Sequence, residues 1–114
     1  MIQVYHNSRC GKSRSAIQLL EERGQAFEIK AYLQQIPTRE ELKIVLEKLG
    51  INPIDLIRKK ETVFVEKYKG KSFTDTEWID IMIENPILIE RPIVINGNKA
   101  VIARPAELLL GIIV

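Results

Sequence analysis

Residues 2–20 have the sequence IQVYHNSRCGKSRSAIQLL, which changes its hydrophobic period near the middle. Apolar and polar or aromatic residues alternate over residues 2–5, as in a short half-buried strand. From Lys12 onward the apolar positions recur with a helical period, and Gly24 stands where a left-handed C-terminal cap is expected. The stretch therefore predicts a strand, a polar turn and a helix that starts inside the turn.

The only cysteine of the chain, Cys10, lies in that polar turn. A helix N-terminus and neighbouring cations lower the pKa of a thiol, and the thiolate is the nucleophilic form. A lone cysteine is more commonly a small buried apolar residue. The neighbours of Cys10 are small or polar, however, so we favour a reactive thiol over a buried one.

Three further residues near the turn are candidates for the same site. Gly11 lets backbone N–H groups close on an anion, although a glycine at such a turn often only relieves backbone strain. Ser13 offers a hydroxyl to a thiolate or to a bound oxyanion. His6, the only histidine, either tunes the pKa of the thiol or is a hydrogen-bonded structural residue. With one histidine and one cysteine, no metal site is expected.

The whole chain, residues 1–114, is predicted to form a single domain, with 46% hydrophobic and 28% charged residues. No apolar run approaches the roughly 18 to 20 residues that span a bilayer, and the first residues do not resemble a secretory signal, so no membrane association is expected. A free thiol persists best in a reducing compartment, which favours the cytoplasm. The net charge of +2 is too small and too dispersed to indicate nucleic-acid binding.

The middle of the chain is predicted to be helical. Capping boxes at residues 38–41 and 74–77 begin two helices, which end near Gly50 and before Pro86. Residues 61–68 combine strand-prone side chains with flanking glutamate and lysine, and we favour a helix there.

The two flanks of this helical block are predicted to form a sheet. Residues 27–33 alternate as a second strand, and Asn96-Gly97 joins two later strands in a tight hairpin. Pro105 can occupy the first position of a terminal helix. The resulting order fits an α/β thioredoxin-like sandwich, with a mixed sheet and a helical insertion between strand 2 and the C-terminal hairpin.

Three arginines stand apart from the helix faces. Arg58 follows a short apolar segment, whereas Arg91 and Arg104 each precede a proline and bracket the hairpin. The start of one hairpin strand lies beside the end of its partner, so Arg91 and Arg104 are expected at the same edge. Guanidinium groups bind tetrahedral oxyanions bidentately. Any one of the three alone would be a solvated surface residue, but together with Cys10 they predict a site for a small oxyanion beside a thiolate.

Four segments in chain order, residues 6–14, 56–59, 86–94 and 104–107, resemble the glutaredoxin-coupled arsenate reductase family of the ArsC/Spx-like superfamily. The resemblance covers essentially the whole chain. It implies a thioredoxin-like fold, a cis peptide bond before Pro92, and reduction of arsenate to arsenite.

The resemblance also implies a role for each matching residue. Cys10 would attack arsenate to give a thiol-linked adduct. His6 would help to set the thiol pKa, Ser13 would hydrogen-bond near the sulfur, and Pro92 would lie beside the cysteine. The oxyanion and its intermediates would be bound by Arg58, Arg91 and Arg104, with Arg58 at the arsenite-level adduct.

The number of thiols indicates a partner. Reducing arsenic(V) to arsenic(III) takes two electrons, and a mechanism that ends in a disulfide needs two thiols. This chain supplies one. The second must come from outside, and the resemblance implies glutathione as co-substrate, followed by glutaredoxin. We expect no bound cofactor and a monomer whose substrate is arsenate or a related oxyanion.

Two alternatives belong to other functional classes. A non-enzymatic transcriptional regulator of the Spx type commonly carries a Cys-x-x-Cys switch, but Ser13 fills the second position here. A monothiol glutathione-dependent oxidoreductase would share Cys-x-x-Ser without needing three arginines. The chain also departs from the common family pattern at Ser8, where proline is frequent, and at Lys12, where threonine is frequent.

Overall fold

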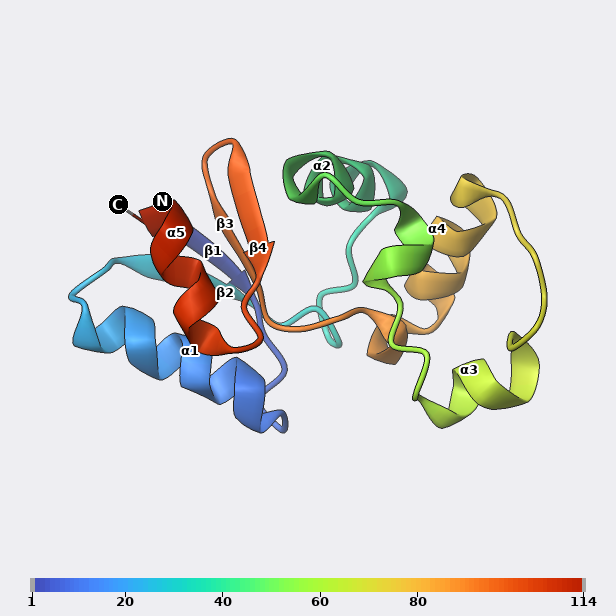
Figure 1. Cartoon of the computed structure of the whole chain (residues 1–114), viewed down its shortest axis with the longest axis horizontal. Helices are drawn as coiled ribbons and strands as arrows, with labels where there is room; N and C mark the ends of the chain where they lie inside the picture. The colour runs from blue at the N-terminus through green and yellow to red at the C-terminus, as the bar shows by residue number, and fades with distance from the viewer. Residues whose placement is uncertain (1, 114) are drawn as a thin grey trace. The chain divides into compact units, whose positions relative to one another are not determined.

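The computed structural model describes residues 2–113, which form two compact units (Figure 1). The first unit contains the residues up to Gln35 and those from Arg91 onward, and the second contains Ile36–Glu90. The second unit is the helical insertion expected between strand 2 and the hairpin. The single domain expected over residues 1–114 stays a prediction.

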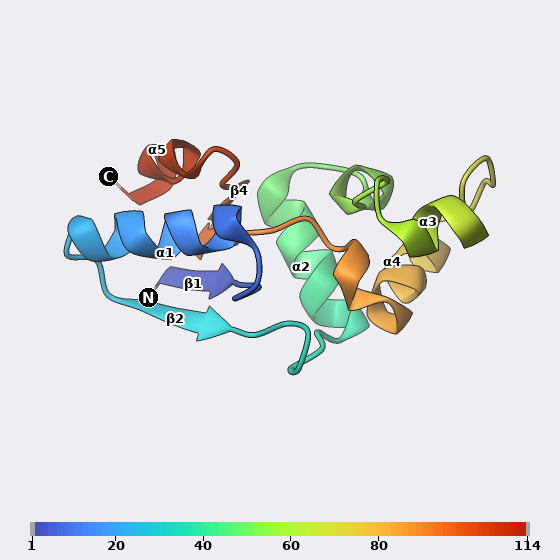
Figure 2. The same cartoon turned by 90° about the horizontal axis from the view of Figure 1, so that it is seen from below.

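The first unit is built on a four-stranded mixed sheet in the order β2-β1-β3-β4, which confirms the predicted fold class. The two N-terminal strands are parallel, and Figure 2 shows them side by side. The hairpin strand β3 joins the sheet antiparallel to β1, with Val4 opposite Val94. The strands are β1 (Ile2–Tyr5), β2 (Phe27–Lys30), β3 (Ile93–Asn96) and β4 (Lys99–Ile102).

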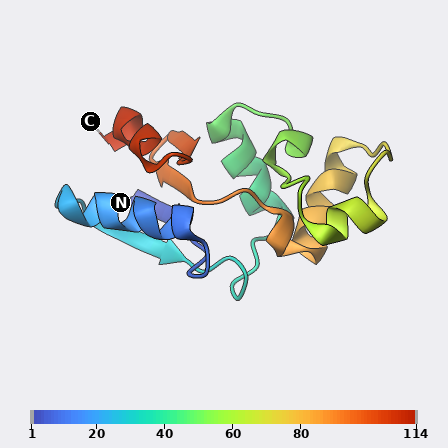
Figure 3. The same cartoon turned by 60° about the horizontal axis from the view of Figure 1, so that its bottom comes forward.

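One helix of this unit, α1 (Gly11–Glu22), connects the two parallel strands and packs against the C-terminal segment η3 (Ala106–Leu109). In Figure 3 the C-terminal helical segment, which continues as α5 (Leu110–Ile113), lies near α1. Burying an aliphatic side chain stabilises a fold by about 1.5–3 kcal/mol, so this shared core holds α1 against the sheet. The buried core residues are Ile2, Val4, Ala16, Leu20, Val94, Ala103, Ala106 and Leu109.

Two predicted boundaries were wrong. The second strand ends at Lys30 and not at residue 33, because a turn follows in which the N–H of Gln34 donates to the carbonyl of Ala31. The turn buries Tyr32 completely, and its ring stacks on Tyr5 at 6.2 Å between centroids. Pro105 is not the first helical residue; it precedes the short helix η3 and follows a cis peptide bond.

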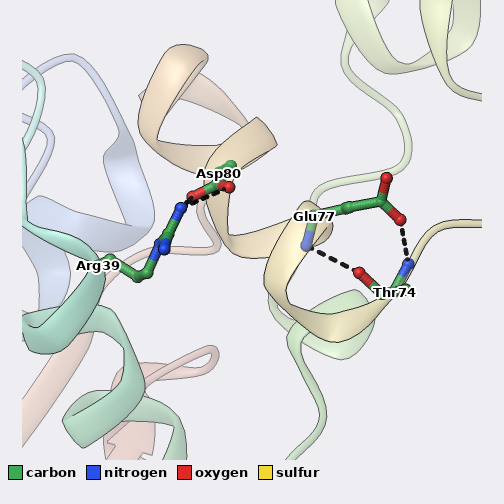
Figure 4. A network of polar contacts seen from close by, with 4 residues as sticks. All are labelled: Arg39, Thr74, Glu77 and Asp80. Carbon is green, nitrogen blue, oxygen red and sulfur yellow. Dashed lines mark hydrogen bonds and ion pairs between the residues drawn. The ribbon is translucent and has the colours of Figure 1, made fainter.

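The second unit is helical, and both predicted capping boxes are present. Thr38 begins α2 (Arg39–Leu49) and Thr74 begins α4 (Asp75–Glu84), and the latter box is drawn in Figure 4. The ambiguous segment is a short helix, α3 (Thr62–Lys67), as favoured above. Two 3-10 segments, η1 (Pro53–Leu56) and η2 (Pro86–Leu88), complete the unit.

Aromatic side chains form part of the interior of the second unit. Phe64 and Trp78 stack at 6.2 Å between centroids, and Phe73 meets the edge of Trp78 at 4.8 Å. Within residues 2–113, no helix combines the length and the apolar composition that crossing a membrane requires.

Candidate active site

Cys10 is the residue that immediately precedes α1, and its backbone is extended, with φ −94° and ψ 121°. Its carbonyl accepts the N–H of Arg14 at 3.1 Å, and its own N–H donates to the carbonyl of Asn7 at 3.0 Å. Asn7 also accepts the N–H of Arg9 through its side chain, and its N–H donates to the buried Ser13 hydroxyl at 3.2 Å. The turn therefore holds the partly exposed thiol at the start of the helix.

The surroundings of Cys10 lower the pKa of its thiol below the usual value. Burial acts in the opposite direction and raises the pKa, because it disfavours the charged form. The backbone N–H of Ser13, the guanidinium of Arg91 and the backbone N–H of Lys12 outweigh it by hydrogen-bonding to the thiolate. These are the helix N-terminus and the arginine that the sequence indicated.

The structure brings Arg91 and Arg104 to the same edge beside Cys10, as predicted. Arg104 Nη1 lies 3.9 Å from Cys10 Sγ and donates to the carbonyl of Arg91 at 3.2 Å. The Ala103 N–H donates to the carbonyl of Pro92 at 2.9 Å, which joins the two Arg-Pro pairs just outside the hairpin. The Arg91–Pro92 peptide bond is cis, as predicted, and so is the Arg104–Pro105 bond.

His6 lies at the end of β1, and its backbone N–H donates to the carbonyl of Lys30 at 3.0 Å. Burial and the positive charge of Arg14 lower the pKa of His6, which favours the neutral ring. Among the described residues its Nδ1 is buried without a hydrogen-bond partner. A neutral ring adds no positive charge near the thiolate, so any tuning by His6 would act through hydrogen bonding; this role stays a prediction.

Gly11 and Ser13 contribute to the site in different ways. The backbone of Gly11 does not have positive φ, and a Cβ there would meet only Arg14 Nη2 at 3.7 Å. Its backbone therefore does not require glycine. Ser13 acts on the thiol through its N–H, while its hydroxyl accepts from Asn7. Substrate binding by either residue stays a prediction.

An open cavity of about 640 Å³ adjoins the thiol along the first turns of α1. Arg14 lines it and is anchored by donating from Nη1 to the carbonyl of Ser8 at 2.9 Å. Sequence reasoning missed Asn7 and Arg14 as supports of the turn. An asparagine directly after a strand is a turn signal, and it could have identified Asn7. The cavity is lined by Cys10, Gly11, Lys12, Arg14, Ser15 and Gln18.

Arg58, the third predicted arginine, belongs to the second unit. Its N–H donates to the carbonyl of Leu88 at 2.7 Å, and its Nε lies 3.8 Å from Oε1 of Glu90. Sequence reasoning missed Glu90, because the contact depends on an isolated antiparallel bridge between Ile57 and Ile89. The two residues of this bridge lie far apart in the sequence, and no periodic pattern of residues indicates that they pair.

The fold is thioredoxin-like, and a thiol of lowered pKa lies beside two arginines that each precede a cis-proline, so the protein is of the thiol-dependent class of this fold. Residues 5–112 match the sequence model of the ArsC family, and the chain belongs to this family.

Relatives resemble the chain over nearly its whole length. It is 39% identical to the uncharacterized protein YfgD of Escherichia coli K12, over 98% of this chain and 96% of that protein. It is 37% identical to an arsenate reductase of Escherichia coli K12, over 98% of this chain and 80% of that protein. The solved structure of an arsenate reductase from Vibrio cholerae is 39% identical, with a TM-score of 0.93, and covers 98% of this chain and 97% of that one.

Proposed function

We propose that this protein is an oxidoreductase that reduces arsenate to arsenite, using Cys10 as the nucleophile and an external thiol as the second reductant. The observation that carries the proposal is the 3.9 Å approach of Arg104 Nη1 to Cys10 Sγ, beside the buried Arg91. The arsenate reductases that resemble the chain over most of its length support the choice of oxyanion.

The first step is attack of the Cys10 thiolate on the arsenic of arsenate. An arsenic–sulfur bond forms, an arsenic–oxygen bond breaks, and the leaving oxygen departs as water after taking up protons. Arsenic remains at the +5 level. The lowered pKa of Cys10 supplies the thiolate, while Arg91 and Arg104 offset the negative charge that would repel the approaching oxyanion.

The second step needs a thiol that the chain does not contain. We propose glutathione as this co-substrate, with no bound cofactor: its thiol replaces a hydroxyl of the Cys10 adduct, which leaves as water. The thiol of glutaredoxin, the proposed partner, then forms a disulfide with the glutathione sulfur. These two sulfur atoms are oxidised while arsenic gains two electrons and stays on Cys10 as the arsenite-level adduct, which water cleaves to release arsenite. Arg58 is assigned to the arsenite-level adduct. We place the protein in the cytoplasm, because a free thiol persists in a reducing compartment. We also propose that it acts as a monomer.

The test is arsenite release from arsenate in the presence of glutathione and glutaredoxin. We expect release in the wild type, none in Cys10→Ser, and loss when either thiol source is omitted. Arg23→Ala is the matched control, because Arg23 lies at the other end of α1, just after its last residue. Release that continues in Cys10→Ser would exclude the mechanism. Activity on a glutathione mixed disulfide that Arg91→Ala leaves unchanged would favour the monothiol oxidoreductase instead.

A further inference from the structure

The bridge between Ile57 and Ile89 fixes the positions of Arg58 and Glu90 within the second unit. The N–H of Arg58 donates to the carbonyl of Leu88 at 2.7 Å, and the N–H of Glu90 donates to the carbonyl of Leu56 at 2.8 Å. Ile57 and Ile89 are buried, with 4% and 0% exposure. Successive side chains of extended segments alternate between faces, so Arg58 and Glu90 share the opposite face.

Arg58 and Glu90 are diagonal neighbours across this bridge. Diagonal positions of an antiparallel pair are within reach of long side chains. Arg58 Nε accordingly lies 3.8 Å from Glu90 Oε1, with side-chain exposures of 20% and 30%. The bridge therefore places the two side chains within ion-pair distance of each other.

The guanidinium of Arg58 meets Glu90 on only one side. The contact is an ion pair at Nε, which is buried and makes no hydrogen bond within residues 2–113. Arg39 in the same unit differs, since it binds Asp80 through both Nε and Nη2 at 2.8–3.0 Å (Figure 4). The carboxylate of Glu90 therefore engages the Arg58 guanidinium less fully than Asp80 engages that of Arg39.

We propose that Glu90 is a positioning residue for Arg58: its carboxylate, at ion-pair distance from Nε, restrains the guanidinium for binding of an arsenic oxyanion adduct. The inference rests on the proposed function, which assigns that adduct to Arg58. An arginine side chain loses rotamer freedom when it binds, and a carboxylate that holds it beforehand reduces this loss at the moment of reaction.

A double-mutant cycle tests whether Glu90 acts through Arg58. Glu90→Gln keeps the shape of the side chain and removes its negative charge. Arg58→Lys keeps the positive charge but lacks the guanidinium Nε that lies near Glu90. We expect Glu90→Gln to lower kcat for arsenate about fivefold, the size expected of a partly exposed ion pair, with KM changed less than about twofold. In the Arg58→Lys background Glu90→Gln should have almost no further effect.

The matched control is Asp80→Asn, which breaks the other arginine ion pair of this unit. Its kcat should equal that of the wild type. An equal effect of Glu90→Gln in both Arg58 and Lys backgrounds would overturn the inference, as would a change confined to KM.

A second measurement does not depend on arsenate. In a proton–nitrogen NMR spectrum, the Nε–Hε signal of Arg58, assigned by its loss in Arg58→Lys, should exchange slowly in the wild type and rapidly in Glu90→Gln. Equal exchange in both proteins would overturn the positioning role. If the wild type released no arsenite, the proposed function would fail, and this signal alone would decide whether Glu90 holds Arg58.

Discussion

Replacing Arg104 tests the electrostatic basis of the proposed reaction. Arg104 Nη1 lies 3.9 Å from Cys10 Sγ, and no carboxylate of the described residues forms an ion pair with Arg104. Two unit charges at that distance gain at most about 4 kcal/mol at an effective dielectric near 20. Because Arg104 is partly exposed, we expect the smaller contribution of a hydrogen bond to a charged group, about 1.5–3 kcal/mol.

This contribution corresponds to a fall of roughly 10- to 100-fold in kcat/KM for arsenate in Arg104→Ala. Arg104→Lys should recover part of the loss, because lysine keeps the charge but cannot present two parallel donors. The assay is the initial rate of arsenite release at saturating glutathione and glutaredoxin. Arg23→Ala is the control, and iodoacetamide labelling shows that the thiol remains accessible. An Arg104→Ala variant with more than half of the wild-type kcat/KM would refute the reasoning.

Three further predictions concern the thiol, its turn and the second unit. Because the pKa of Cys10 is lowered in the folded state, its contribution to the free energy of unfolding is fully present above the unfolded-state pKa and is lost as pH falls through the folded-state pKa. Cys10→Ser should therefore flatten the pH dependence of chemical denaturation over that range, and a slope equal to that of the wild type would contradict the lowered pKa. Ser13→Ala leaves the buried Asn7 N–H without its acceptor and should cost about 1–3 kcal/mol in urea unfolding; a cost below about 0.5 kcal/mol would show that another acceptor replaces it. Thr74→Ala removes a capping box and should cost about 1 kcal/mol by the same measurement, with exposed Thr76→Ala as the control.

Local signals in the sequence were sufficient for most of the fold. Capping boxes act within four residues, and the Asn96-Gly97 turn fixes its own hairpin register, with Asn96 opposite Lys99. The end of β2 could not be predicted in this way, since burial of Tyr32 against Tyr5 overrides the alternation that continues to residue 33. Tertiary packing decides such a boundary, and no local pattern reports it.

The candidate site was predictable where hairpin geometry brings residues together. Arg91 and Arg104 precede prolines on either side of one hairpin, so their meeting at one edge follows from strand pairing. The lowered pKa of His6 could not be predicted, because it depends on burial and on Arg14, eight positions away and in a helix. Glu90 was missed for a similar reason, since a single bridge between distant residues places it near Arg58.

The residues that activate the thiol and the residue assigned to the later adduct belong to different units. Each group that lowers the pKa of Cys10 comes from Ser13, Lys12 or Arg91, all in the first unit. Arg58 and Glu90 belong to the second, whose last residue is Glu90. Thiolate formation and arsenate turnover should therefore separate experimentally. Arg58→Ala should leave the pH profile of Cys10 alkylation unchanged while lowering arsenite release, whereas Arg91→Ala should shift that profile to higher pH. A profile that moved equally in both variants would show that thiol activation is shared between the units.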